Sequence, residues 1–144
     1  MILSMWADLV RPVSKIRQMA ERRTMYRTVI ADDSEEFRAW LRPLLEGDSA
    51  FKVVGEAGSG KETLDICLRL QPDLLIMDVF MPDGEGTQVA GLLQSRAPKV
   101  RTILISANAG AVYEQLAQSK GAEGFIPKIA LTINALRAVL EKGS

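Results

Sequence analysis

The stretch Leu74–Asp78, LLIMD, decides the fold of this chain of 144 residues. Four apolar residues follow one another and end in a carboxylate, with the turn sequence QPD just before them and MPDGEG shortly after. An unbroken apolar run of this length between turn residues is typical of a strand covered on both faces. Such strands occur in parallel sheets that lie between two layers of helices, so we expect an α/β protein.

Similar β-rich runs recur along the chain from Thr28 onward, and each precedes a helical pattern. Parallel strands require crossover connections, which are usually helices, so the repeated strand–helix unit predicts a parallel sheet. We therefore expect a (βα)5 architecture, a doubly wound sheet of five parallel strands. The expected strands are residues 28–31, 51–57, 73–79, 100–107 and 124–127.

Several expected helices contain residues that set their ends. Ser34 opens the helix after the first strand, and Pro43 is expected to kink or shorten the last turn of that helix. The pattern AVYEQLAQSKG, residues 111–121, predicts a helix that Gly121 ends. A final helix is expected over residues 131–142.

Composition excludes several kinds of chemistry. The chain is 47% hydrophobic, which is enough to form the core of one domain. Its 144 residues are too few for two domains. It contains no histidine, which removes Ser-His-Asp hydrolysis and most zinc sites. The single cysteine, Cys67, falls on the apolar face of an expected helix and indicates a buried thiol. The formal net charge is zero, so overall charge gives no argument for nucleic-acid binding.

No apolar run approaches the length of a membrane span. Residues 1–10, MILSMWADLV, are interrupted by Asp8 and lack a basic start, so they make a poor secretory signal. We therefore expect a soluble, cytoplasmic protein, with membrane contact unlikely to be its role.

Polar side chains stand at the carboxyl ends of the expected strands, where the ligand sites of open parallel sheets gather. They are Asp32, Asp33, Asp78, Ser106 and Lys128. Taken singly, each has a simple structural explanation, such as a helix cap or a surface charge. Together they place three carboxylates at one edge, where crowding favours a bound Mg²⁺ because that ion prefers oxygen ligands. With no histidine present, the best candidate for covalent chemistry is a carboxylate nucleophile that forms an aspartyl phosphate.

The stretch 55–63, GEAGSGKET, supports a competing interpretation as the P-loop of a small nucleotide hydrolase. It follows an apolar run, and its glycines and Lys61 come before a helical pattern. Glu62, however, occupies the position of the Ser or Thr that binds Mg²⁺ in such loops, and its carboxylate would repel a triphosphate. The interpretation also leaves the strand-end residues without a role, so it stays an alternative.

The chain from residue 28 to about 141 resembles the receiver domain of two-component response regulators, which has a CheY-like, flavodoxin-like fold. The resemblance is carried by VIADDSEEFRAWLRPLLE, QPDLLIMDVFMPDGEG, TILISA and KGAEGFIPK. It implies a phosphoacceptor signalling module with weak self-dephosphorylation, rather than an enzyme that turns over a substrate. It implies a sensor histidine kinase as partner and a possible homodimer. A receiver-like binding scaffold without phosphorylation is a third alternative, against which the intact polar set argues.

The resemblance assigns a metal site and a phosphoacceptor. Asp78 would accept a phosphoryl group from the phosphohistidine of a sensor kinase. Mg²⁺ would be held directly by Asp33, Asp78 and the backbone carbonyl of Phe80, and by Asp32 mainly through water. Physically, this is in-line transfer in which the metal neutralises developing charge.

The resemblance also assigns a switch. Ser106 would be the hydroxyl that moves toward the phosphoryl oxygens, and Lys128 would pair with the phosphate. Phe125 would be the aromatic residue whose inward rotation reports activation. The phosphoryl charge would thereby bias a bistable surface around the last two strands.

The first 27 residues are not part of a usual receiver, so we expect an N-terminal extension over 1–27 and a receiver domain over 28–144. The extension carries six Lys/Arg against two acidic residues, and its apolar residues predict an amphipathic helix over 2–20 that Pro12 breaks or begins. Either this helix packs or dimerises, or Met25 is the natural start and the preceding residues are an upstream extension. Contact with an anionic membrane is the weakest of the three readings.

The tail NALRAVLEKGS resembles the last receiver helix of NarL-like regulators, in which a helix-turn-helix DNA-binding domain normally follows. These 144 residues contain no such domain, so the chain is interpreted either as an excised receiver or as a stand-alone regulator. We expect no direct nucleic-acid binding by this chain.

Overall fold

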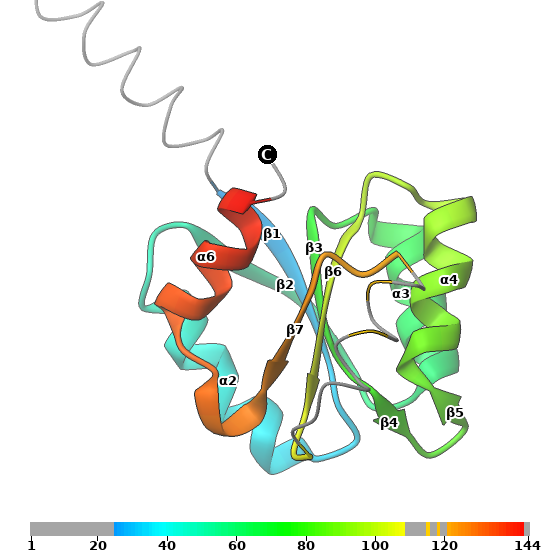
Figure 1. The fold of residues 1–144 in the computed structure, drawn as a ribbon, viewed down its shortest axis with the longest axis horizontal. Coiled ribbons are helices and arrows are strands. Elements are labelled where there is room, and N and C mark those ends of the chain that lie inside the picture. Colours follow the sequence, from blue (N-terminus) through cyan, green and yellow to red (C-terminus); the bar gives the residue numbers. More distant parts are fainter. Residues whose placement is uncertain (1–24, 109–114, 116–117, 119–120, 143–144) are drawn as a thin grey trace, which may run out of the picture.

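A computed structural model describes residues 25–108, 115, 118 and 121–142 of the chain. The core of this structure is a sheet of five parallel strands in the order β2-β1-β3-β6-β7 (Figure 1). The strands are β1 (Tyr26–Ala31), β2 (Phe51–Ala57), β3 (Leu74–Asp78), β6 (Arg101–Ser106) and β7 (Gly124–Pro127). The (βα)5 prediction of a doubly wound parallel sheet is confirmed for the strands and for the four helices described below.

Helices cover both faces of the sheet (Figure 1). One face carries α2 (Glu35–Glu46) and α6 (Ile133–Lys142), and the other carries α3 (Gly60–Leu70) and α4 (Gly86–Arg96). The LLIMD stretch explains this arrangement, because its side chains alternate between two separate hydrophobic cores. Leu74 and Ile76 pack with α2 and α6, whereas Leu75 and Met77 pack with α3 and α4, and all four are fully buried.

The sheet has its switch in strand order between β1 and β3. The chain goes from β1 outward to β2 and then returns across β1 to β3, on the other side. At such a point two loops leave the carboxyl ends of adjacent strands in opposite directions and open a crevice. The two-stranded hairpin β4 (Phe80–Met81) and β5 (Gly84–Glu85) follows β3 directly at this edge.

Strands β3 and β6 are one residue shorter at each end than predicted, and α6 begins two residues later than predicted. Two further differences have a physical cause. Strand β1 begins at Tyr26, before the expected residue 28, because Tyr26 pairs with Phe51 and their rings stack with centroids 5.7 Å apart. Helix α2 begins after the N-cap Ser34 as expected, but Pro43 does not shorten it, since the helix continues to Glu46. Pro43 and Ala39 are both exposed, so the Ala39 carbonyl that loses its helical donor can be hydrated instead.

The helix predicted over residues 111–121 and the helical extension predicted over 2–20 lie outside the described residues, apart from residues 115, 118 and 121. Within the described ranges no helix is long and apolar enough to span a bilayer. The division into an extension over 1–27 and a receiver domain over 28–144 stays a prediction.

Candidate functional site

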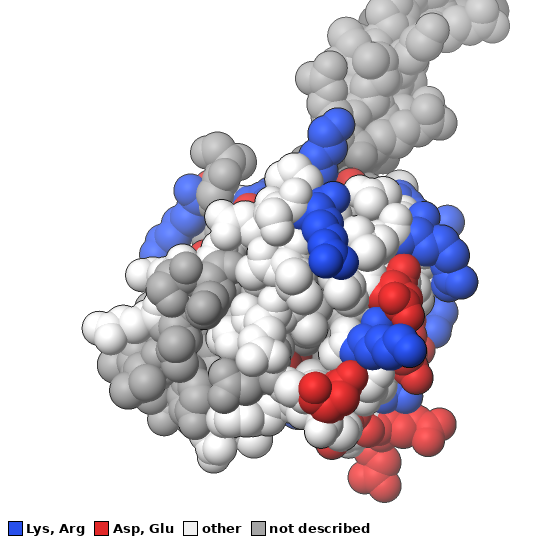
Figure 2. All heavy atoms as spheres, turned by 90° about the vertical axis from the view of Figure 1, so that its right-hand side faces the viewer, with Lys and Arg blue, Asp and Glu red and all other residues white. Residues whose placement is uncertain are grey.

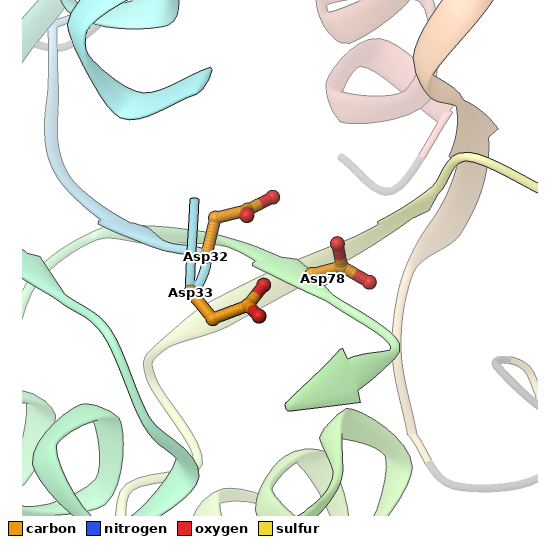
Figure 3. A group of neighbouring side chains, drawn as sticks. All are labelled: Asp32, Asp33 and Asp78. Carbon is orange, nitrogen blue, oxygen red and sulfur yellow. The ribbon is translucent and has the colours of Figure 1, made fainter. Parts of the chain in front are cut away.

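Three of the predicted carboxylates meet at the carboxyl edge of the sheet. Asp32 and Asp33 follow β1, and Asp78 ends the neighbouring strand β3, so their carboxyl groups point toward the same space (Figure 3). Each offers an oxygen that lies within 4.8 Å of oxygens of the other two. Asp32 is fully buried and Asp33 is exposed, so the cluster has one wall in the protein and one side open to solvent. Such a set of hard oxygen donors fits a divalent cation such as Mg²⁺.

Lys128, the residue that follows strand β7, reaches this cluster. Its Nζ lies 2.6 Å from Asp32 Oδ2 and 2.8 Å from Asp78 Oδ2, so one ammonium group bridges two carboxylates. The same Nζ lies 4.2 Å from the centroid of the Phe37 ring on α2, close enough for a cation–π contact. Lys128 is thus held between an aromatic ring and two carboxylates and points into the site.

The charges of the site are unbalanced. Burial raises the pKa of Asp32, although its bonds to Lys128 and to the Ser34 N–H act in the opposite direction. Burial lowers the pKa of Lys128, but the bonds to Asp32 and Asp78 outweigh this effect and leave the pKa raised. Lys128 is therefore positively charged at neutral pH, and among the described residues it is the one cation in an ion pair with any of these three carboxyl groups. The arrangement favours additional positive charge.

The remaining predicted residues are Ser106, Phe80 and Phe125. Ser106 ends β6, next to β3, and is almost fully buried, while its Oγ accepts the Asn108 N–H at 3.1 Å. Phe80 donates its backbone N–H to Asp78 Oδ1 at 2.8 Å, which orients that carboxylate. Phe125 lies on β7, half-buried, and packs against the core under α3 and α4.

Gly86 and Arg38 also support the site, and the sequence analysis did not identify either of them. A Cβ at Gly86 would lie 2.4 Å from the Asp78 carbonyl oxygen, so only glycine fits beside the end of β3. Arg38 donates to the Asp32 carbonyl oxygen and to Glu56 Oε1 and thereby ties the end of β1 to β2. The glycine ending MPDGEG was a visible signal for the first, whereas no local pattern reveals the second.

The stretch 55–63 is a helix N-terminus whose donors are already bonded within the chain. Ser59 caps α3 and accepts the Glu62 N–H at 3.1 Å, and Glu62 accepts the Gly58 N–H at 3.0 Å. The carboxylate of Asp83 accepts the N–H groups of Gly60 and Lys61, at 2.7 and 2.9 Å. A carboxylate therefore occupies the place where a P-loop would hold a phosphate.

The prediction of a buried thiol is confirmed. Cys67 lies on α3 with no exposed surface, packed in the core under α3 and α4. Burial raises the pKa of the thiol to about 12, so the group is a neutral core residue at physiological pH.

Residues 28–141 match the family model of the response regulator receiver domain. The chain belongs to this family. Among curated relatives of this receiver domain, the DNA-binding transcriptional activator DevR/DosR of Mycobacterium tuberculosis is 32% identical over 120 residues, covering 83% of this chain and 55% of the relative. The probable transcriptional regulatory protein NarL of the same species is 35% identical over 117 residues, covering 80% of this chain and 53% of the relative. The chain thus spans about half the length of these curated regulators.

Solved structures of receiver domains agree with the fold. The receiver domain of the putative response regulator NarL from M. tuberculosis superposes with a TM-score of 0.75 at 32% identity, covering 82% of this chain and 95% of that one. The response regulator domain of Thermotoga maritima CheB gives a TM-score of 0.68 at 29% identity, covering 82% of this chain and 90% of that one. The CheY-like fold, the receiver assignment and the likeness to NarL-like regulators are therefore confirmed, and the nucleotide-hydrolase alternative is not favoured.

Some curated relatives of this receiver domain are enzymes. The protein-glutamate methylesterase/protein-glutamine glutaminase of Pseudoalteromonas atlantica is 35% identical over 105 residues, which cover 72% of this chain but 27% of the relative. The similarity therefore covers only a minor part of that enzyme's length.

Proposed function

We propose that this receiver domain is a Mg²⁺-dependent phosphoacceptor of a two-component system, and that Asp78 carries the phosphoryl group. The observation that supports the proposal most is the Lys128 ammonium group, which bridges Asp32 and Asp78 beside a third carboxylate. A crowded carboxylate with a fixed cation beside it suits a reaction in which negative phosphoryl oxygens arrive next to it.

The donor set fits a bound Mg²⁺. Asp33, Asp78 and the backbone carbonyl of Phe80 would hold the ion directly, and Asp32 would act mainly through water. When bound, the ion supplies positive charge that screens the phosphoryl oxygens from the carboxylates. The buried Asp32, whose pKa is raised by burial, gains charge compensation from the same ion.

In the proposed reaction an Asp78 carboxylate oxygen attacks the phosphorus of a phosphohistidine on the kinase. A P–O bond forms, the P–N bond breaks, and the imidazole leaves with its electron pair and takes a proton from solvent. Phe80 N–H keeps Asp78 oriented, and Lys128 neutralises charge on the transferred group. Ser106 lies at the adjacent strand end, from which its hydroxyl would bond a phosphoryl oxygen.

The proposed consequence is a switch in the surface around β6 and β7. Movement of Ser106 toward the phosphoryl group would be accompanied by inward rotation of Phe125. The partners would be a sensor histidine kinase and a second protein that reads the switched surface, in the cytoplasm, without direct binding of nucleic acid by this chain. The protein would have no substrate turnover beyond slow loss of its own phosphoryl group.

The test is incubation of the chain with acetyl phosphate and Mg²⁺, followed by intact mass measurement. The expected result is the gain of one phosphoryl group, which is absent in Asp78→Asn and in samples with excess chelator. Asp33→Asn should reduce the yield by weakening the metal site, whereas Asp65→Asn, an exposed carboxylate on α3, is the matched control and should leave the yield unchanged. A gain of mass that persists in Asp78→Asn would refute the assignment of Asp78.

A further inference from the structure

Helix α4 differs from the other described helices in its exposed face. That face consists of Gln88, Gly91, Leu92 and Ser95, which stand at positions i, i+3, i+4 and i+7 and are called the α4 face below. None of the four is charged, whereas α2, α3 and α6 each expose several charged side chains. Figure 2 shows the side of the molecule that carries α4, with a wide area free of charged atoms.

Gly91 has no packing reason within the described chain. A Cβ built at this position meets no atom within 4 Å, and the backbone of Gly91 is not left-handed. Gly86, in contrast, is required because its Cβ would lie 2.4 Å from the Asp78 carbonyl oxygen. Glycine in the middle of a helix is less stable than alanine. A glycine that the fold does not need is explained if another backbone approaches the helix at this point.

A groove beside Leu92 offers space for an apolar side chain. It lies between α3 and the start of α4, has a volume of about 220 Å³, and includes Leu64, Val89 and Leu92 in its wall, together with the charged Lys61 and Asp83. Leu92 is 40% exposed at the edge of this groove. The α4 face therefore combines an exposed knob, a neighbouring hole and a position of close backbone approach.

Charged residues border the α4 face at both ends. Asp83 precedes the helix and lines the groove with Lys61, while Arg96 is the last residue of the helix, and all three are exposed. Two such helices packed antiparallel would each place Arg96 near the partner's Asp83. Packed parallel, they would place like charges together.

We propose that the α4 face is a contact surface between two copies of this chain, packed antiparallel about a two-fold axis near Gly91. Gly91 is the middle residue of α4, Gly86–Arg96, so both halves of the helix contribute equally to a two-fold contact. A neutral face meets its own copy without like-charge repulsion and without desolvating a charge. A neutral face gives no electrostatic attraction to the basic segment 1–27 or to a polyanion. The binding partner proposed for this face is therefore a second copy of the chain.

The expected contact is weak. The 11 residues of α4 span about 16 Å, so the face buries less than the roughly 800 Å² per partner of a standard interface. A dissociation constant of roughly 0.1–1 mM is therefore expected.

The test is sedimentation velocity of the full chain over about 0.01–2 mM, a range that brackets this constant. The measurement omits Mg²⁺ and phosphodonors, so its outcome does not depend on the phosphoacceptor proposal. Leu92→Glu should weaken association at least about tenfold, because it brings two like charges together at the axis. Ala138→Glu, which adds the same charge to an exposed position on α6, is the matched control and should associate like the unmodified chain.

Gly91→Ala provides a second test, because it should change stability and association in opposite directions. A glycine with no role in association would change stability alone. It should raise the urea midpoint of unfolding, because alanine favours the helix, and yet weaken association at least about threefold. Circular dichroism checks that each variant is folded. A chain that stays monomeric at about 2 mM, or association that Ala138→Glu abolishes and Leu92→Glu leaves intact, would overturn the proposal.

Discussion

Two regions of this receiver domain carry residues that suggest phosphate binding, the carboxyl edge of β1 and β3 and the N-terminus of α3. At the α3 N-terminus, Asp83 and Ser59 already accept the N–H groups of Gly60, Lys61 and Glu62. At the sheet edge, one ammonium group faces three carboxyl groups. The backbone donors of the glycine-rich region thus have acceptors within the chain, whereas the carboxyl groups of the sheet edge outnumber the positive charge that faces them. Unbalanced charge, and not glycine spacing, therefore distinguishes the proposed phosphoacceptor site from the α3 N-terminus.

The largest effect is expected from removing the cation of the sheet edge. Lys128→Met leaves the buried Asp32 and Asp78 without their shared partner, so the free energy of unfolding should fall by about 2 kcal/mol. Phosphorylation by acetyl phosphate should slow at least about 100-fold, because a fixed positive charge beside the transferred group is lost. Urea unfolding and intact mass measure the two effects.

Lys142→Met is the matched control, since Lys142 is an exposed lysine in the last turn of α6. Its free energy of unfolding should change by less than about 0.5 kcal/mol. Equal stability of Lys128→Met and Lys142→Met would contradict the view that the sheet edge depends on the Lys128 ammonium group.

A smaller effect of opposite sign is expected at Asp32. Because burial raises its pKa in the folded protein above the ordinary 3.8, Asp32 stabilises the fold most when protonated, and this contribution is lost as pH rises through the folded-state pKa. Asp32→Asn should therefore raise the free energy of unfolding at pH 7 by about 1–2 kcal/mol. The gain should shrink as pH is lowered through the folded-state pKa and should vanish below 3.8, where the carboxyl is protonated in both the folded and the unfolded state.

The measurement is urea unfolding at several pH values in the absence of Mg²⁺. Asp33→Asn is the control, because Asp33 is exposed beside Asp32, and its replacement should change the free energy by less than about 0.5 kcal/mol. A loss of stability in Asp32→Asn at pH 7 would show that the bond to Lys128 outweighs the burial of the charge.

The α3 N-terminus should respond as a structural cap only. Ser59→Ala removes the acceptor for the Glu62 N–H and should lower the free energy of unfolding by about 1 kcal/mol. The yield of phosphorylated protein should match that of the unmodified chain, since no part of the sheet edge changes. A marked loss of phosphorylation in folded Ser59→Ala would contradict the view that the α3 N-terminus has only a structural role.

The smallest effect is expected at Lys61. Its side chain is exposed, and its backbone N–H, which bonds Asp83, is kept in Lys61→Ala. Phosphorylation and the free energy of unfolding should both be unchanged within about 0.5 kcal/mol. ATP hydrolysis by the unmodified chain that disappears in Lys61→Ala would instead restore the P-loop interpretation.

The sequence predicted the sheet because each decisive signal was local. LLIM is an unbroken apolar run, and Asp32, Asp33 and Asp78 stand at the carboxyl ends of strands, so the topology alone brings them together. Contacts between distant segments left no such signal. The Asp83 carboxylate on the α3 N-terminus and the Phe37 ring beside Lys128 depend on the tertiary arrangement.

One local signal fitted two different motifs. The sequence SGKE, Ser59–Glu62, has the S-x-x-E spacing of a helix N-cap, and the structure shows Ser59 capping α3. The same glycines and lysine suggested a P-loop because both motifs stand at the start of a helix. The two differ in which group accepts the backbone N–H donors, and that group here is Asp83, 22 residues beyond Lys61 in the chain.

The most direct test of the central claim is to locate the phosphoryl group itself. The chain is phosphorylated with acetyl phosphate and Mg²⁺, the acyl phosphate is reduced with borohydride, and the peptides are sequenced by mass spectrometry. We predict that the reduced residue is Asp78, at the end of LLIMD, and that Lys128→Met yields far less of it. Modification found instead at Asp32, at Ser106, or in the stretch 55–63 would contradict the account.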